Sequence, residues 1–316
     1  MIKAEKLTKK FGEKEALGEV SCIIPEGSIY GLVGSNGAGK STLLRILSGI
    51  YKADSGSVNV DGQEIWENPA AKGRIALVTD DPYFPAGITL NRMVQVSMAL
   101  NPYFDKERYE YLTNLLGLST RVAVSTFSKG MKRQAAIAMA LCRKPSYLLL
   151  DEAFDGLDPV MRRLVRSIIA QEIMDRGMTT VITSHSLREL EGTCDTLALL
   201  HKGGMVLESD VGTLKTTLFK LQVAFRDEYD EQRFEGFDIL HFKKSGSVAQ
   251  VIAKGDADKA VRTLRSMDPI LLDVLPLTLE EVFDYEMEAL GYSFHADGLG
   301  FLEKDSKEKP EMGEQR

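Results

Sequence analysis

The segment from Gly34 to Ser41 constrains the fold more than any other part of the chain. It reads Gly-Ser-Asn-Gly-Ala-Gly-Lys-Ser, follows an apolar run that ends at Val33, and leads into a helical apolar pattern that ends at Ser48. Glycines in such a turn let successive backbone N–H groups point at one anion, and the helix N-terminus adds its positive dipole end. The segment therefore predicts a phosphate-binding loop between a strand and a helix.

The loop predicts a nucleotide site in which each residue has an expected contact. Lys40 is expected to reach the β- and γ-phosphates, and the hydroxyl of Ser41 is expected to bind Mg²⁺. The residues expected to bind the nucleotide here are Gly34, Ser35, Asn36, Gly37, Ala38, Gly39, Lys40, Ser41 and Thr42.

Composition argues against several other classes of protein. The chain has 316 residues and a net charge of -7, without a basic stripe of the kind that binds nucleic acid, so no nucleic-acid partner is expected. Its apolar runs are too short to cross a bilayer, and its lysine-rich start lacks the apolar block of a signal peptide. The 3 widely spaced cysteines suit reduced, buried thiols. We therefore expect a cytoplasmic protein.

Short apolar runs alternate with helical patterns up to about residue 210, which indicates an α/β sheet with parallel strands. The expected strands are Ile2–Leu7, Ser28–Val33, Ser57–Val60, Ile75–Val78, Tyr147–Asp151, Thr179–Ser184 and Thr196–His201. The expected helices between them are Ser41–Ser48, Ser128–Cys142 and Val160–Asp175. Residues 82–143 hold two further helical patterns, Leu90–Met98 and Asp105–Leu116, and no convincing strand, which predicts a helical subdomain.

The pattern changes after about residue 212. Leu218–Phe225, Ile239–Phe242 and Val248–Ala253 alternate like antiparallel strands, and Ala257–Met267 and Leu279–Leu290 are helical in pattern. The predicted organisation is a nucleotide-binding domain at residues 1–212, a small α+β domain at 213–292, and a disordered tail at 293–316, where charged residues predominate.

Two carboxylates follow another apolar strand. Tyr147–Leu150 leads into Asp151, which is expected to hold Mg²⁺ directly or through water. Glu152 comes next, where a second carboxylate can orient and deprotonate an attacking water. Acidic residues at a strand end are common, and it is their pairing with the phosphate loop that favours a hydrolytic site.

Between these motifs lies Phe127-Ser128-Lys129-Gly130-Met131-Lys132-Arg133-Gln134, which resembles the Leu-Ser-Gly-Gly-Gln signature of ATP-binding cassette (ABC) proteins. The resemblance covers about the first 210 residues and also includes Phe154-Asp155-Gly156-Leu157-Asp158 and Thr183-Ser184-His185. It implies a P-loop NTPase core with a helical insert, and ATP with Mg²⁺ as ligands. It further implies that Phe11 stacks on adenine, that His185 contacts the γ-phosphate, and that Lys40 and Glu152 are catalytic with it.

The signature residues are implied to act on a second chain. Ser128, Lys129, Gly130 and Met131 would close over the ATP held by a partner in a head-to-tail dimer, either a homodimer or a heterodimer with a paralogous ATPase. The physical reason is that one nucleotide does not need two phosphate-binding helix ends from one chain. Taken alone, Ser128 is equally an ordinary helix cap, and Phe11 and His185 are equally packed side chains.

The chain departs from the family pattern at several positions. Lys129 and Met131 stand where the signature has Gly and Gln, whereas Ser128 and Gly130 match it. Asp80 stands where the family usually has the Gln that links Mg²⁺ and the attacking water to the membrane partner. Asp80 is a candidate holder of a metal-bound water, but it is shorter than Gln and charged.

The resemblance implies the ATP-binding and hydrolysing subunit of a bacterial ABC transporter, which powers a separate transmembrane permease from the inner face of the cell membrane. Leu275–Phe283 resembles the C-terminal extensions of bacterial export ATPases paired with ABC-2-type membrane proteins, so an exporter is expected. That domain is equally a dimer-stabilising appendage or a regulatory site. The alternative is a soluble ABC-type ATPase switch that acts on a protein or nucleic-acid partner without transport.

Overall fold

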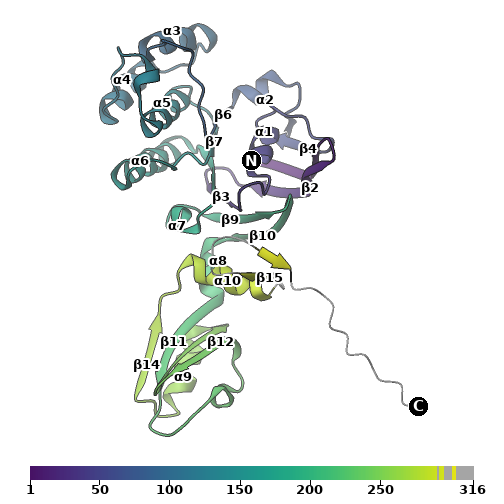
Figure 1. Cartoon of the computed structure of the whole chain (residues 1–316), viewed down its shortest axis with the longest axis vertical. Coiled ribbons are helices and arrows are strands. Elements are labelled where there is room, and N and C mark those ends of the chain that lie inside the picture. Colours follow the sequence, from purple (N-terminus) through teal and green to yellow (C-terminus); the bar gives the residue numbers. More distant parts are fainter. Residues whose placement is uncertain (290–291, 295–300, 304–316) are drawn as a thin grey trace, which may run out of the picture. The chain divides into compact units, whose positions relative to one another are not determined.

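The chain divides into two compact units, residues 1–211 and residues 212–316. A sheet of mostly parallel strands forms the centre of the first unit. The computed structural model describes residues 1–289, 292–294 and 301–303. The strands of this sheet lie in the order β10-β9-β3-β8-β7-β6 (Figure 1). Along the chain they are β3 (Ile29–Val33), β6 (Ile75–Val78), β7 (Tyr147–Asp151), β8 (Thr179–Ser184), β9 (Thr196–His201) and β10 (Gly204–Asp210). All except β10 run parallel to their neighbours, which confirms the predicted pairing. Their carboxyl ends meet at one edge, where open α/β sheets bind ligands.

A second sheet lies in the same unit, and it corrects one expectation. Its order is β2-β1-β4-β5, formed by β1 (Ile2–Phe11), β2 (Lys14–Ile24), β4 (Ser55–Val60) and β5 (Gln63–Glu64). The expectation that β1 and β4 belong to the parallel sheet is wrong, because both pair antiparallel here. The reason is the connection from β1 to β2, which is too short for the crossover that parallel strands require.

Helix α1 (Lys40–Leu47) packs between the two sheets. Its buried residues Leu43 and Leu44 share one apolar cluster with Leu7 of β1 and Leu32 of β3. The helix that begins at the phosphate loop is therefore held from both sides, which fixes the position of the loop.

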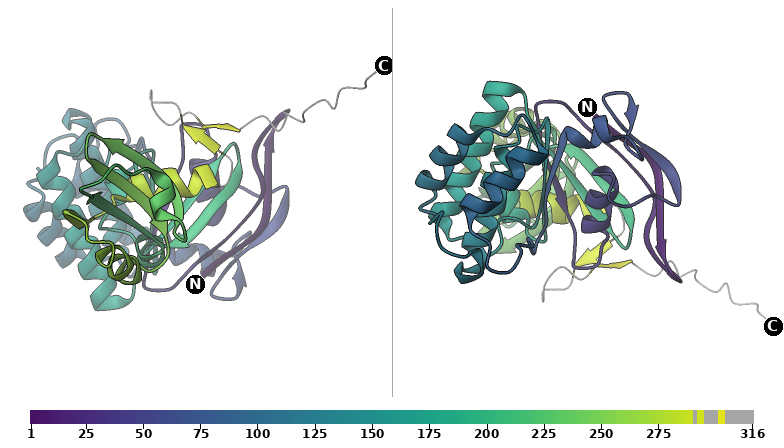
Figure 2. Two further views of the ribbon diagram at one scale, coloured as in Figure 1. Left: turned by 90° about the horizontal axis from the view of Figure 1, so that it is seen from below. Right: turned by 90° about the horizontal axis from the view of Figure 1, so that it is seen from above.

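The helices of the insert are α3 (Leu90–Leu100), α4 (Lys106–Leu115) and α5 (Lys129–Leu141), with a 3₁₀ turn at Val124–Thr126. They lie together on one side of the first unit (Figure 1 and Figure 2). Each begins where a polar side chain accepts a bond from a free N–H group: Thr89 for α3, Asp105 for α4 and Ser128 for α5. Residues 82–143, all of which the structure describes, contain no strand, as predicted.

Three further helices complete the first unit. They are α2 (Pro69–Gly73), α6 (Pro159–Arg176) and α7 (Leu187–Leu190). Asp158 accepts bonds from two N–H groups at the start of α6, and Gly177 ends that helix in the left-handed conformation at φ 66°. Among the helices of residues 1–289, none has the length and apolar character needed to cross a membrane.

The second unit is built on an antiparallel sheet of order β12-β13-β11-β14. Its elements in chain order, with α8 at the junction, are α8 (Val211–Thr217), β11 (Leu218–Ala224), a 3₁₀ turn (Glu231–Phe234), β12 (Asp238–Ser245), β13 (Val248–Lys254), α9 (Ala257–Arg265), β14 (Leu271–Leu275), α10 (Leu279–Ala289), β15 (Tyr292–Phe294) and β16 (Phe301–Glu303). Phe225, Tyr229 and Phe234 form the aromatic centre of its core, with the guanidinium of Arg233 3.9 Å from the Phe225 ring.

The end of the chain differs in part from the expectation. The strands β15 and β16 pair antiparallel, and the sequence did not indicate them. Leu290, the expected end of the last helix, and the predicted tail at 295–300 and 304–316 lie outside the residues that the structure describes.

Candidate functional site

The loop between β3 and α1 is shaped by its glycines. A Cβ atom on Gly34 would lie 2.3 Å from the carbonyl oxygen of Leu200, so no larger residue fits there. Gly39 caps α1 at φ 111°, a conformation that side chains rarely adopt. Gly37, at φ 83°, has nothing within 4 Å of its Cβ position, so its backbone faces open space. The loop is thus tied to β9 at one end and left accessible at its tip.

Lys40 lies under this loop and is only 4% exposed. Its Nζ donates to the carbonyl oxygens of Gly34 at 2.7 Å and Ser35 at 3.2 Å. The same ammonium lies 3.2 Å from Oε1 of Glu152. The cation is therefore held at the junction of the phosphate loop and the end of β7.

Asp151 and Glu152 are positioned by a threonine on the neighbouring strand. Thr183 donates from Oγ1 to Oδ1 of Asp151 at 2.9 Å, and the same Oγ1 accepts from the N–H of Glu152 at 3.0 Å. Burial raises the pKa of Asp151, while hydrogen bonds from Ser41 and Thr183 act in the opposite direction. This role of Thr183 was not predictable from the sequence, because a threonine in an apolar strand is typical of any sheet.

Replacing Asp151 with asparagine is expected to raise the melting temperature of the nucleotide-free protein at neutral pH by a few degrees. The pKa of Asp151 is higher in the folded than in the unfolded chain, so stability is lost as pH rises through the folded value. Asparagine removes this charge and can still accept the bonds from Ser41 and Thr183. Thermal denaturation with EDTA present measures the change.

The control for this variant is Asp54→Asn. Hydrogen bonds from Lys9 and the backbone of Lys10 lower the pKa of Asp54, so its stabilising effect is present at neutral pH and lost on acidification. The control is therefore expected to leave the melting temperature unchanged or slightly lower it. A lower melting temperature for Asp151→Asn would show that burial is not the dominant influence on this carboxylate.

Glu152 stands between Lys40 and a histidine that follows β8. Its backbone has φ 45°, in the left-handed region that is uncommon for residues with a side chain. Its Oε2 lies 3.5 Å from Nδ1 of His185, and Oδ2 of Asp155 lies 4.0 Å from the same nitrogen. These separations are longer than hydrogen bonds, so the imidazole is close to both carboxylates without being bonded to either.

A cavity of ≈ 440 Å³ opens over these groups. It is lined by Phe11, Lys14, Ala16, Asn36, Gly37, Gly39, Lys40, Ser41, Thr42, Asp80 and Glu152. The structure thus brings most of the predicted nucleotide and metal residues together. Phe11 is half-exposed, and its ring meets that of Tyr51 edge-on at 5.6 Å. Lys14 and Ala16 were not predicted to line the site, because the strand that carries them has no clear pattern in the sequence.

The signature residues lie elsewhere. None of Ser128, Lys129, Gly130 and Met131 lines the cavity of its own chain. Ser128 accepts from the N–H of Met131 at 3.2 Å as the cap of α5. A Cβ atom on Gly130 would lie 2.7 Å from the carbonyl oxygen of Gly156, so the start of α5 packs tightly on the loop after β7.

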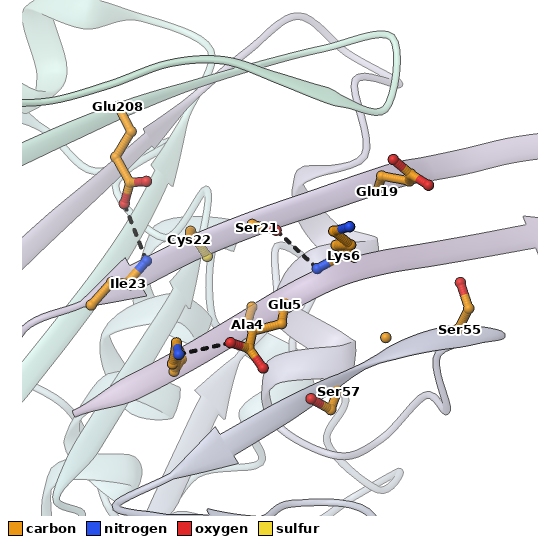
Figure 3. A pocket seen from close by; sticks show the side chains of 12 residues that line it. Ala4, Glu5, Lys6, Glu19, Ser21, Cys22, Ile23, Ser55, Ser57 and Glu208 are labelled. Atoms are coloured by element: carbon orange, nitrogen blue, oxygen red, sulfur yellow. Dashed lines mark hydrogen bonds and ion pairs between the residues drawn. The ribbon is translucent and has the colours of Figure 1, made fainter.

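A second hollow, of ≈ 820 Å³, lies on the β1, β2 and β4 strands (Figure 3). Several of its polar groups are engaged within the chain. Lys3 pairs with Glu5 at 2.7 Å, and Glu208 accepts from the N–H of Ile23 at 3.3 Å and from the hydroxyl of Tyr30 at 2.9 Å. No residue of the phosphate loop lines it, so it is separate from the nucleotide site.

The chain is similar in sequence to known ATP-binding proteins of transport systems. The ABC transporter family matches residues 17–155. The ABC transporter ATP-binding protein YtrB of Bacillus subtilis is 30% identical over 283 residues, which cover 90% of this chain and 97% of YtrB. The lantibiotic transport ATP-binding protein SrtF of Streptococcus pyogenes is 33% identical over 229 residues, 71% of this chain and 98% of SrtF. The bacitracin transport ATP-binding protein BcrA of Bacillus licheniformis is 32% identical over 218 residues, which cover 68% of this chain and 71% of BcrA.

Solved structures agree on the fold. An ATP-binding subunit of an ABC transporter matches with a TM-score of 0.63 at 22% identity, over 68% of this chain and 92% of its own. A dimeric ATP-binding cassette in a post-hydrolysis state with ADP and Pi matches with a TM-score of 0.60 at 22% identity, over 67% of this chain and 99% of the cassette.

The fold and the phosphate-loop site define a P-loop ATPase of the cassette type, which confirms the predicted fold class. The chain belongs to the family of ABC transporter ATP-binding proteins. It is therefore an ATP-binding subunit of an ABC transporter and an ATP hydrolase, as predicted, and the alternative of a switch without transport is not favoured.

Proposed function

We propose that this chain hydrolyses Mg–ATP at the phosphate loop to drive export through a separate permease, from the inner face of the cell membrane. The observation that carries the proposal is the position of Glu152 in the cavity, 3.2 Å from the buried ammonium of Lys40, which lines the same cavity, and 3.5 Å from the imidazole of His185. A cation, a carboxylate and an imidazole beside a phosphate loop form a set suited to phosphoryl transfer to water.

The nucleotide is proposed to bind along the loop from Gly34 to Thr42. Backbone N–H groups at the start of α1 favour phosphate oxygens, and Lys40 supplies a positive charge that is already desolvated. Phe11, which also lines the cavity, offers a half-exposed aromatic ring on which adenine can stack.

Mg²⁺ is proposed to be held by Ser41 and Asp151, with Asp80 as a further holder. The three side chains offer hydroxyl and carboxylate oxygens, which are the donors that Mg²⁺ prefers. Ser41 already donates to Asp151, and the charge of Asp80 acts to raise the pKa of Asp151, so the groups are close enough to share a cation. When bound, Mg²⁺ would neutralise charge on the β- and γ-phosphates.

Glu152 is proposed to orient the attacking water and to accept its proton. Its carboxylate is partly buried, lines the cavity, and has a cation on one side and the imidazole of His185 on the other. His185 is proposed to hold the γ-phosphate, because it stands beside Glu152 at the edge of the sheet where the phosphate loop lies.

ATP-binding subunits of ABC transporters dimerise and work with a membrane permease. In this chain, Ser128, Lys129, Gly130 and Met131 are proposed to contact the ATP held by the second subunit, an identical or a paralogous chain. Support comes from the exposure of Ser128 and Lys129 and from the start of α5, where N–H groups favour anions.

The helical insert is proposed to receive the permease. Tyr83, Leu100 and Tyr103 are large apolar or aromatic side chains that are mostly exposed there, and such groups are typical of contact surfaces between proteins. Export as the direction is supported by the resemblance of Leu275–Phe283 to export ATPases, and by relatives named for bacitracin and lantibiotic transport.

Leu100→Glu is expected to reduce recovery of the permease at least about tenfold, the usual effect of losing a central apolar contact. The tagged full-length chain is cross-linked in membranes of its native host, purified, and its partners are identified by mass spectrometry. ATP hydrolysis by the isolated variant is expected to stay unchanged.

The matched control is Met174→Glu on α6, because Met174 and Leu100 are both 81% exposed and only Leu100 lies in the insert. Recovery of a polytopic partner with wild type and with this control supports the proposal. Wild-type chain that stays in the cytosolic fraction without such a partner would support the ATPase switch instead.

A further inference from the structure

Arg133 on α5 is an arginine buried inside the first unit. Only 1% of its side chain is exposed, and it heads the largest fully buried side chains of the part that the structure describes. Burying a guanidinium is costly unless its donors are satisfied, so its partners indicate what it holds in place.

The partners of Arg133 are carbonyl oxygens of two different loops. Nε and Nη2 donate to the carbonyl oxygen of Asp80 at 3.1 Å and 2.8 Å, and Nη1 donates to that of Asp155. The first loop follows β6 and the second follows β7, and these strands are parallel neighbours. One side chain from the helical insert therefore joins two loops at the ligand-binding edge of the sheet.

Each of these loops carries a carboxylate close to the residues of the proposed site. Asp80 lines the cavity, and the carboxylate of Asp155 lies 4.0 Å from Nδ1 of His185. A shift of Arg133 would therefore disturb both Asp80 at the cavity and Asp155 beside His185. Small displacements of this kind cost large factors in rate when reacting groups must be aligned.

We propose that Arg133 is a positioning residue for ATP hydrolysis, which holds the Asp80 loop and the Asp155 loop in register with each other and with the helical insert. Through Arg133, a movement of the helical insert is transmitted directly to both loops. This inference rests on the proposed placement of ATP over the phosphate loop, and it assigns Arg133 no contact with the nucleotide.

The planar shape of guanidinium is what makes the connection specific. Its donors form a rigid fork, so one group can satisfy carbonyls from two directions at once. Lysine keeps the positive charge but presents it as a single point on a flexible chain. Arg133→Lys should therefore keep the buried charge and lose the link between the loops.

The test compares Arg133→Lys and Arg133→Met with wild type in the full-length protein. We expect Arg133→Lys to lower kcat for ATP about tenfold or more, while KM and the Kd for Mg–ATP stay within about threefold. Amide hydrogen exchange should become faster in peptides that contain Asp80 or Asp155. Arg163→Lys, at an exposed position of α6, is the matched control and should behave as wild type.

Several outcomes would overturn the inference. Wild-type kcat in Arg133→Lys would show that the fork is not needed, and an equal loss of ATP affinity and kcat would indicate a damaged fold. Unchanged exchange in both loops would show that Arg133 does not hold them. If Arg133→Met fails to fold, Arg133→Lys alone decides. Absence of ATP binding by wild type would instead refute the proposed nucleotide site, so the two failures are distinguishable.

Discussion

Replacing Glu152 with glutamine is expected to lower kcat for ATP hydrolysis at least about 100-fold, the usual contribution of a positioned general base. Glutamine keeps the size of the side chain and the hydrogen bond from the Glu152 N–H to Thr183, but it cannot accept a proton. ATP affinity should be retained, because the loop and Lys40 are intact. The variant should then remain dimeric in the presence of ATP, which gel filtration can detect.

The control is Glu64→Gln, which removes the same charge from an exposed position on β5. It should hydrolyse ATP at the wild-type rate. Turnover close to wild type in Glu152→Gln would show that another group takes the proton, and the carboxylates to examine next would be Asp80, which lines the cavity, and Asp155, 4.0 Å from His185.

Replacing Lys40 with alanine is expected to weaken ATP binding about 10- to 100-fold, which is the loss of one charge-assisted contact of about 1.5–3 kcal/mol. Lys40 is the buried cation of the loop, and its removal also leaves Glu152 without its partner at 3.2 Å. Titration calorimetry with Mg–ATP measures the affinity directly, independently of hydrolysis.

Lys14→Ala is the control that tests whether the position of the lost positive charge, and not only its sign, determines ATP affinity. Lys14 lines the same cavity but is exposed on β2, where water screens its charge. It should change the affinity by no more than about threefold. Equal losses in the two variants would mean that the cavity attracts ATP by overall charge, and the assigned role of Lys40 would then be wrong.

The buried parallel strands and the capped helices were predictable from sequence, because one residue pattern determines each of them. The apolar runs of β6, β7, β8 and β9 match the expected bounds, since strands buried on both faces have no alternative pattern. By contrast, β2 and β10 were missed. No residue of β10 is fully buried, and β2 carries many exposed residues and contains Gly18 and Glu19, where its pairing with β1 shifts register.

The candidate site was predictable where side-chain chemistry identifies it and not where backbone groups do. Glycines, a lysine and carboxylates at fixed spacing indicate a phosphate site from sequence alone. The contacts of Arg133 end on carbonyl oxygens, which every residue possesses, so no residue type at positions 80 or 155 signals them. The same holds for Thr183, whose hydroxyl links Asp151 to the backbone of Glu152.

The close approach of Gly130 to the carbonyl of Gly156 has a consequence for reading mutations at the signature sequence. Any side chain at position 130 first disturbs packing within its own subunit, before a second subunit is involved. Loss of activity in such a variant therefore carries no information about the dimer. Ser128 is exposed and its hydroxyl accepts from the N–H of Met131, so a threonine there, which can still cap the helix, disturbs its own subunit less than any change at Gly130.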